Sequence, residues 1–226
     1  MRIKALLLLV TSSTVTFGTL LAQVAAPTES ITRTVPPGFC LLANNLNHPG
    51  GNNLNSVLPN VPIESQVLKF SNNSYHADIF DGTMWLDALT GEPSGTAVSP
   101  GEGFFFFNPT AQDLEITFTG EAPRGIITIP LRPGFSLVGS PVPRTITLVP
   151  TNGFPHVLEM QIVRFDCATQ RYRVIIGGPC GFGIDTICWY DGNTGDPVDP
   201  TIPPGEGFFI FNPRATVLSW VRNWTP

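Results

Sequence analysis

The sequence is poor in charge, and above all in positive charge. Charged residues make up 13% of the chain, and the formal net charge is −5. Beyond residue 22, Lys69 is the single lysine, and the arginines are scattered. Binding to nucleic acid or to an anionic membrane surface needs a stripe of basic residues. The composition therefore argues against both kinds of partner.

Motifs for metal-dependent and nucleophilic chemistry are missing too. There is no C-x-x-C pair, and the histidines, His48, His76 and His156, lie far in sequence from the cysteines, which argues against zinc. No G-x-S-x-G motif supplies a nucleophile for the His76–Asp78 pair, so we interpret His76 as a surface residue. We expect a chain that is not an enzyme.

Long apolar runs are scarce. The first 22 residues carry one: Arg2 and Lys4 precede an apolar stretch that ends at Ala22, as is typical of a secretory signal peptide. A retained anchor is the alternative, but polar residues 11–14 break the run short of the roughly 20 residues that a span needs. We therefore expect an exported chain, secreted, periplasmic or at the cell surface, with no membrane span.

What the chain does have is an internal repeat. Residues 100–109, Pro-Gly-Glu-Gly followed by four phenylalanines and Asn-Pro, return at 204–213 with one Phe replaced by Ile. Upstream blocks match as well, and the second copy is nine residues longer between Phe165 and Trp189. A period of about 100 residues exceeds a solenoid unit of about 20–50 residues. It suits two tandem domains or two halves of one pseudo-symmetric domain.

The repeat defines the expected organisation of the chain. After a signal peptide (1–22) and a linker (23–29), we place the first copy at 30–125 and the second at 126–226. Short alternating segments and 45 glycines and prolines indicate an all-β fold of sandwich-like or barrel-like repeats, without a convincing helix. The four consecutive apolar residues at 104–107 and at 208–211 predict strands buried on both faces, in contact with the sister copy.

Four cysteines in an exported chain predict disulfides. If residues 161–166, 171–176 and 182–189 form a meander, Cys167 and Cys188 lie at one end and Cys180 at the other, about 20 Å away. That distance is too long for a bridge. We therefore predict Cys167–Cys188, with Cys167–Cys180 as the alternative.

Two acidic features are candidates for chemistry. Glu102 and Glu206 could form the carboxylate pair of a glycosidase, but each lies in the same turn of its own copy, so a structural role is favoured. The second feature is a set of oxygen ligands in one loop of the second copy, which could hold calcium: Asp191, Asn193, Asp196 and Asp199. An ordinary turn is the alternative.

Unshared residues are the better binding candidates, since shared ones serve the architecture. Trp85 and Trp189 occur in both copies and are expected in the core. The Asn-rich loop at 44–55 occurs only in the first copy and is a candidate recognition loop. The aromatic residues interpreted as unshared could stack on sugar rings. They are Tyr172, Tyr190, Trp220 and Trp224.

The pattern of Pro-Gly-Phe, a later Trp and Pro-Gly-Glu-Gly-Phe-Phe resembles a repeat of exported hypothetical proteins in Verrucomicrobia- and Planctomycetes-like bacteria. It is also similar in outline to modules of bacterial surface proteins, with Phe39 and Phe135 where those modules carry Trp. The resemblance implies an exported all-β module with no assigned activity or catalytic residues. We expect a structural or adhesive protein that contacts a surface protein or polysaccharide. The alternative is a carbohydrate-binding module.

Overall fold

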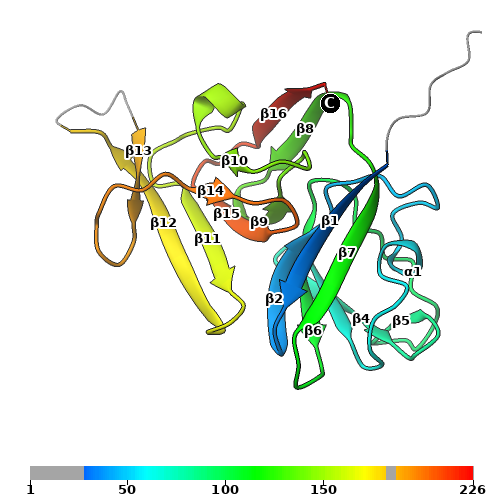
Figure 1. Cartoon of the computed structure of the whole chain (residues 1–226). Helices are drawn as coiled ribbons and strands as arrows, with labels where there is room; N and C mark the ends of the chain where they lie inside the picture. Colours follow the sequence, from blue (N-terminus) through cyan, green and yellow to red (C-terminus); the bar gives the residue numbers. More distant parts are fainter. Residues whose placement is uncertain (1–27, 182–186, 226) are drawn as a thin grey trace, which may run out of the picture.

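The structure is a computed structural model that describes residues 28–181 and 187–225 (Figure 1). The predicted signal peptide and most of the predicted linker lie outside the described residues. Within the described part of the chain, no helix has the length and apolar character needed to cross a membrane.

Two similar sets of strands make up the fold, which is all-β as predicted. The strands of the first copy are β1 (Thr28–Val35), β2 (Gly38–Ala43), β3 (Gln66–Ser71), β4 (Ser74–Phe80), β5 (Trp85–Asp87), β6 (Gly103–Asn108) and β7 (Leu114–Glu121). Those of the second are β8 (Gly125–Leu131), β9 (Gly134–Gly139), β10 (Ile146–Thr147), β11 (Gln161–Asp166), β12 (Arg171–Pro179), β13 (Ile187–Asp191), β14 (Thr201–Ile202), β15 (Gly207–Asn212) and β16 (Leu218–Trp224).

The two copies share one topology. The first has a five-stranded sheet in the order β2-β6-β3-β4-β5, and the second repeats it as β9-β15-β11-β12-β13. A two-stranded ribbon covers each sheet, β1-β7 in the first copy and β8-β16 in the second. Each copy is therefore a small sandwich, and in Figure 1 the two stand side by side.

A short helix, α1 (Leu54–Val57), departs from the prediction of no helix. It forms one turn inside the Asn-rich loop, where the side chain of Asn53 accepts a hydrogen bond from the amide of Ser56 at 3.0 Å. A cap of this kind satisfies an amide that the first turn leaves free. The described part of the second copy has a 3-10 turn, η1 (Pro150–Asn152).

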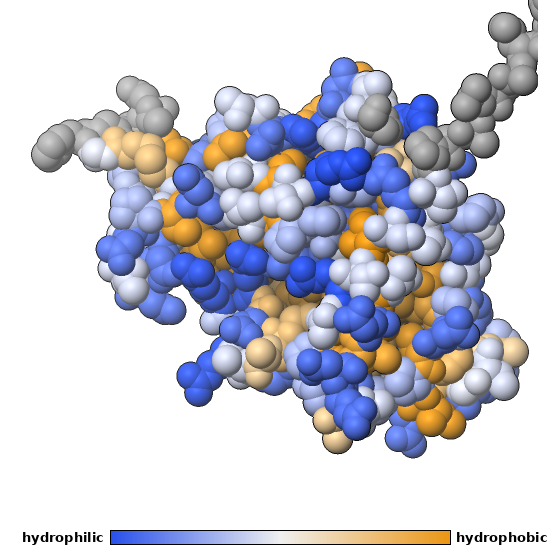
Figure 2. Space-filling view, viewed as in Figure 1, coloured by the Kyte–Doolittle hydropathy of each residue, from blue (hydrophilic) through white to orange (hydrophobic). Residues whose placement is uncertain are grey.

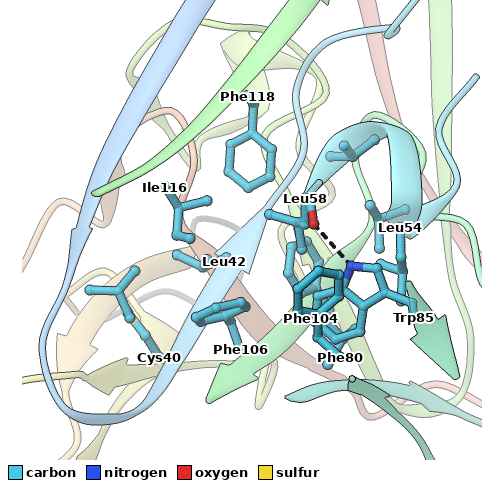
Figure 3. Close-up of a cluster of buried hydrophobic side chains, with 14 residues drawn as sticks. Cys40, Leu42, Leu54, Leu58, Phe80, Trp85, Phe104, Phe106, Ile116 and Phe118 are labelled. Atoms are coloured by element: carbon cyan, nitrogen blue, oxygen red, sulfur yellow. Dashed lines mark hydrogen bonds between the residues drawn. The ribbon is translucent and has the colours of Figure 1, made fainter. Parts of the chain in front are cut away.

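Each sandwich has its own core around a duplicated tryptophan. In the first copy Trp85 is buried beside Phe104 and Phe106, and its indole Nε1 donates to the carbonyl of Leu58 at 3.0 Å (Figure 3). In the second copy Trp189 is buried in the same way and donates to the carbonyl of Leu148 at 2.7 Å. The expectation that both shared tryptophans belong to the core is confirmed.

A third apolar layer joins the copies. Successive strand residues face opposite sides, so Phe104 and Phe106 enter their own core, whereas Phe105 turns to the sister copy. There it meets Phe209, with 6.1 Å between ring centroids, and Phe165, with 5.5 Å. The strands with four apolar residues in a row are therefore buried on both faces, as predicted.

Reciprocal backbone hydrogen bonds show the pseudo-two-fold relation. The amide of Ala43 donates to the carbonyl of Gly205 at 3.0 Å, and the equivalent amide of Gly139 donates to the carbonyl of Gly101, also at 3.0 Å. The backbones approach closely, since a Cβ on Gly207 would lie 2.4 Å from the carbonyl oxygen of Leu42. The two copies therefore pack as one unit.

The disulfides are Cys40–Cys167, which joins the copies, and Cys180–Cys188. The predicted Cys167–Cys188 bridge is wrong, and so is its alternative. Strand β12 continues through the position of the expected turn, so that Gly178 pairs with Cys188 and brings Cys180 beside it. Disulfides persist in oxidising compartments, so two of them fit a non-cytoplasmic protein.

Candidate functional site

The site is an aromatic groove between the two copies, built by the hairpins β3-β4 and β11-β12. Tyr75 lies opposite Phe70 in the first hairpin, and Tyr172 lies opposite Phe165 in the second. Both tyrosines are about half exposed, at 49% and 54%. In Figure 1 the tip of the β11-β12 hairpin lies beside β2 of the other copy, and Figure 2 shows apolar residues at the surface in the recess between them.

Two cavities make up the aromatic groove, and Tyr75 and Tyr172 line both. The larger, of about 400 Å³, also includes Phe70, Phe135 and Phe209. The smaller, of about 210 Å³, is lined by the pseudo-symmetric equivalents of these three, namely Phe165, Phe39 and Phe105. The groove is therefore one duplicated feature whose halves face each other.

Edge-to-face ring contacts repeat across the pseudo-two-fold. Phe70 meets Phe209 at 5.4 Å between centroids, and Phe165 meets Phe105 at 5.5 Å, both with an interplanar angle of 83°. Within each hairpin the tyrosine ring packs on the phenylalanine opposite, at 5.1 Å for Tyr75 and 5.0 Å for Tyr172. These contacts hold the floor rings in place, so the groove is formed before any ligand arrives.

Burial raises the pKa of both tyrosine hydroxyls, and for Tyr75 the nearby Tyr172 raises it further. Both side chains are therefore neutral hydrogen-bonding groups at ordinary pH. The rings also offer apolar faces. The amide side chains of Asn73 and Gln161 add polar groups to the larger cavity. This combination suits a ligand with flat apolar faces and a polar rim.

The two ends of the groove differ. At the smaller cavity, the side chain of Gln170 accepts from the amide of Phe39 at 3.1 Å and donates to its carbonyl at 2.8 Å, beside the Cys40–Cys167 bridge. The second copy has Ser136 at the position of Cys40, and Phe135 is 44% exposed, so the larger cavity is the more open end.

Of the predicted aromatic candidates, only Tyr172 lies in the groove. Trp220 is fully buried against Phe154, so its assignment to a binding surface is wrong. Tyr190 donates its hydroxyl to the carbonyl of Pro179 at 2.8 Å. Trp224 is partly buried, with the guanidinium carbon of Arg144 5.7 Å from its ring centre.

Sequence reasoning missed Tyr75, and the interpretation of Tyr172 as unshared is wrong. Tyr75 and Tyr172 are equivalent, because each faces the phenylalanine at the end of the preceding strand. The turn of the second hairpin is two residues longer, which shifts the alignment by two positions. Counting outward from the turn within each hairpin, instead of applying one offset, would have paired them.

Asp191, one of the proposed calcium ligands, is already held by its own turn and by Arg173. Asp191 accepts from the amides of Asn193 and Thr194, and its second oxygen accepts from Arg173 Nε at 2.9 Å. Asp87 caps the same turn in the first copy. No cluster of three His, Cys, Asp or Glu residues with metal-site geometry, including one from Asp191, Asp196 and Asp199, occurs among the described residues.

The two duplicated glutamates form the same ion pair in each copy. Glu102 accepts from Lys69 Nζ at 3.0 Å and from the amide of Ser99 at 2.8 Å. Glu206 accepts two hydrogen bonds from Arg164, at 2.7 and 2.9 Å. Both contacts tie the Pro-Gly-Glu-Gly turn to the neighbouring strand, in line with the favoured structural role.

The Asn-rich loop contributes to the inter-copy contact. Asn44 and Asn45 are buried, and Asn45 donates to the carbonyl of Ser140 and accepts from the amide of Gly205 at 2.6 Å, both in the second copy. The start of this loop is therefore a clamp between the copies.

A separate cavity of about 530 Å³ lies beside Trp189 and His156, whose rings stack at 4.4 Å. Its rim reaches Ile187, next to residues that fall outside the described chain. The aromatic groove, in contrast, is built from equivalent residues of both copies. Comparison of the chain with protein-family models, curated proteins and solved structures finds no match.

Proposed function

We propose that the chain is an exported, non-enzymatic adhesive protein of the cell surface that binds a polysaccharide in the aromatic groove. The observation that carries the proposal is the facing pair of half-exposed tyrosines, Tyr75 and Tyr172, on a preformed floor of phenylalanines. Apolar ring faces with hydroxyl and amide groups at their edges match the alternating apolar faces and hydroxyls of a sugar ring.

The size of the groove favours a saccharide over a folded protein partner. Stable protein interfaces bury about 800 Å² on each side. A concave site of about 400 Å³ instead falls in the range of small-ligand pockets, about 300–1,000 Å³. One or two sugar rings of a longer chain would fill it. Export and a surface location rest on the predicted signal peptide and fit the two disulfides.

A non-enzymatic function is supported by the state of the acidic side chains. Glu102, Glu206 and Asp191 are all engaged in ion pairs, and the first two lie in equivalent turns of the two copies. The groove is lined by aromatic, aliphatic and amide side chains. Such a surface can hold a ligand, and the described residues that line it include no carboxylate or imidazole, the commonest general acids and bases.

The test is a binding panel of insoluble cellulose, chitin and peptidoglycan together with an array of soluble glycans. We expect retention on at least one polysaccharide. Tyr75→Ala and Tyr172→Ala should each weaken it by about tenfold to a hundredfold, because each removes an aromatic contact of about 1.5–3 kcal/mol.

Tyr190→Phe is the matched control, since Tyr190 is the third tyrosine of the chain and lies outside the groove. It should bind like the unaltered protein. Binding that survives both alanine substitutions would place the ligand elsewhere. If the protein binds no glycan and the groove instead binds an extended peptide, the saccharide proposal is wrong.

A further inference from the structure

A second pocket lies on the other side of the β11-β12 hairpin and contains three arginines. This arginine pocket has a volume of about 430 Å³ and is lined by Arg33 from the first copy and by Arg164, Arg173 and Glu206 from the second. It is separate from the aromatic groove, and among the described residues Phe165 alone lines both the pocket and the smaller cavity.

Two of the three arginines already have carboxylate partners. Arg164 forms a two-fold hydrogen bond with Glu206, and Arg173 pairs with Asp191 at 2.7 Å. Asp166 also lines the pocket, but its carboxylate accepts from the amides of its own turn. The negative charges around the pocket are therefore already engaged.

Arg33 is left without a close acceptor. Its nearest carboxylate oxygen, on Glu206, is 3.8 Å from Nη2, and its Nε is buried with no hydrogen-bond partner among the described residues. A buried, charged donor without an acceptor is costly, and such a group calls for a specific explanation. An anion in the adjoining cavity would supply the missing acceptor.

The other copy shows that the fold does not require an arginine at the position of Arg33. The pseudo-symmetric equivalent of Arg33 is Ile129, which is buried and lines the equivalent cavity beside Glu102. Arg33 occupies the same inward-facing position on β1, between the buried residues Ile31 and Val35. A Cβ on Gly205 would lie 2.6 Å from Arg33 Cγ, so the arginine stem is seated against this glycine.

We propose that the arginine pocket binds an oxyanion, a carboxylate, sulfate or phosphate group, with Arg33 as its principal donor. Guanidinium groups bind these anions with paired, charge-assisted hydrogen bonds. The anion could be free in solution or could be a substituent of an acidic polysaccharide. In both cases the recognised chemistry is the same, and the choice of probe distinguishes the sources.

The experiment follows the side-chain Nε–H signals of arginine by NMR while an anion is added at constant ionic strength. The probes are sodium sulfate, sodium phosphate, glucuronate and neutral glucose. We expect saturable shifts of the Arg33 signal with at least one anion and none with glucose. Tighter binding of glucuronate than of the inorganic ions would indicate a sugar-borne group.

Arg33→Ile copies the residue of the other repeat and should weaken anion binding by about tenfold or more. Arg33→Gln, which keeps a polar stem, is a second variant in case the first does not fold. Arg132→Ile is the matched control, because Arg132 lines the equivalent pocket of the other copy. It should bind the anion like the unaltered protein.

Binding is expected to persist in Tyr75→Ala, which separates this pocket from the aromatic groove. Equal affinity in the unaltered protein and both Arg33 variants, or the lack of any saturable shift of an arginine Nε–H signal, would overturn the proposal.

Discussion

At two positions, one copy carries a charged residue where the other carries an apolar one. Such positions distinguish residues that the fold requires from residues that serve another role. Arg33 stands where the other copy has Ile129, and Asp78 stands where the other copy has Ile175. Both isoleucines are buried, so an apolar residue satisfies the fold at these positions. A charged residue at such a position costs stability unless a partner offsets it.

Asp78 is the clearest case for a stability test. It is fully buried, neither oxygen has a hydrogen-bond partner among the described residues, and the nearest basic side chain is His76, with Nε2 3.4 Å away. We expect Asp78→Val to raise the free energy of unfolding by about 1–3 kcal/mol, because it removes an unsatisfied carboxyl. Urea denaturation at pH 7 measures the change.

The control for this substitution is Ala77→Val on the same strand, at a half-buried position. It should change stability little. A loss of stability in Asp78→Val would contradict this expectation. It would mean that the contact between Asp78 and His76 stabilises the fold more than an apolar residue at position 78 does.

Among the structural elements, the turns that follow β5 and β13 are built alike. Backbone amides of Thr90 and Leu89 hold the pKa of Asp87 below its ordinary value near 3.8. The amide of Asn193 and the guanidinium of Arg173 do the same for the pKa of Asp191. Each carboxylate therefore accepts the hydrogen bonds of its turn in the ionised form, and protonation would weaken that turn.

A lowered folded-state pKa gives a definite pH dependence. Such a carboxyl stabilises the fold above its unfolded value near 3.8, and this contribution is lost as the pH falls through the folded value. We expect Asp191→Ala to be less stable than the unaltered protein at pH 7 and nearly equal to it at pH 2. Urea denaturation at both pH values measures the difference, and a gap that stays constant would contradict this account.

Much at the scale of elements could be predicted from the sequence, because strand patterns and turns are local. The repeat, the two-sided burial of residues 104–107 and the core positions of Trp85 and Trp189 all follow from alternation and duplication. The disulfide pairing depended on where β12 ends, which two glycines in the strand obscured. The aromatic groove depended on how two distant hairpins meet, and no local pattern encodes that.

At the scale of the whole molecule, the fold is a stack of layers. The aromatic layer between the two copies forms the groove. The ribbons β1-β7 and β8-β16 lie outermost, and each sheet separates its own core from the shared layer. The Cys40–Cys167 bridge and the Asn45 clamp cross this layer. The groove therefore exists only while the two copies remain packed together.

The two disulfides should contribute unequally to stability. Cys40–Cys167 closes a sequence separation of 127 residues and Cys180–Cys188 one of 8. On the loop-entropy account, removing the first by Cys40→Ser with Cys167→Ser should cost about 5 kcal/mol, and the second about 2.5 kcal/mol. Guanidinium denaturation of the two double variants gives the comparison. A larger loss of unfolding free energy on removal of Cys180–Cys188 than on removal of Cys40–Cys167 would contradict this account.

Differential scanning calorimetry of the unaltered protein tests the central claim, that both copies form one unit with the groove built into it. If they do, heat unfolds the chain in a single transition whose calorimetric enthalpy equals the van't Hoff enthalpy. Two resolved transitions, or a calorimetric enthalpy about twice the van't Hoff value, would show copies that unfold independently and would contradict a groove fixed between them.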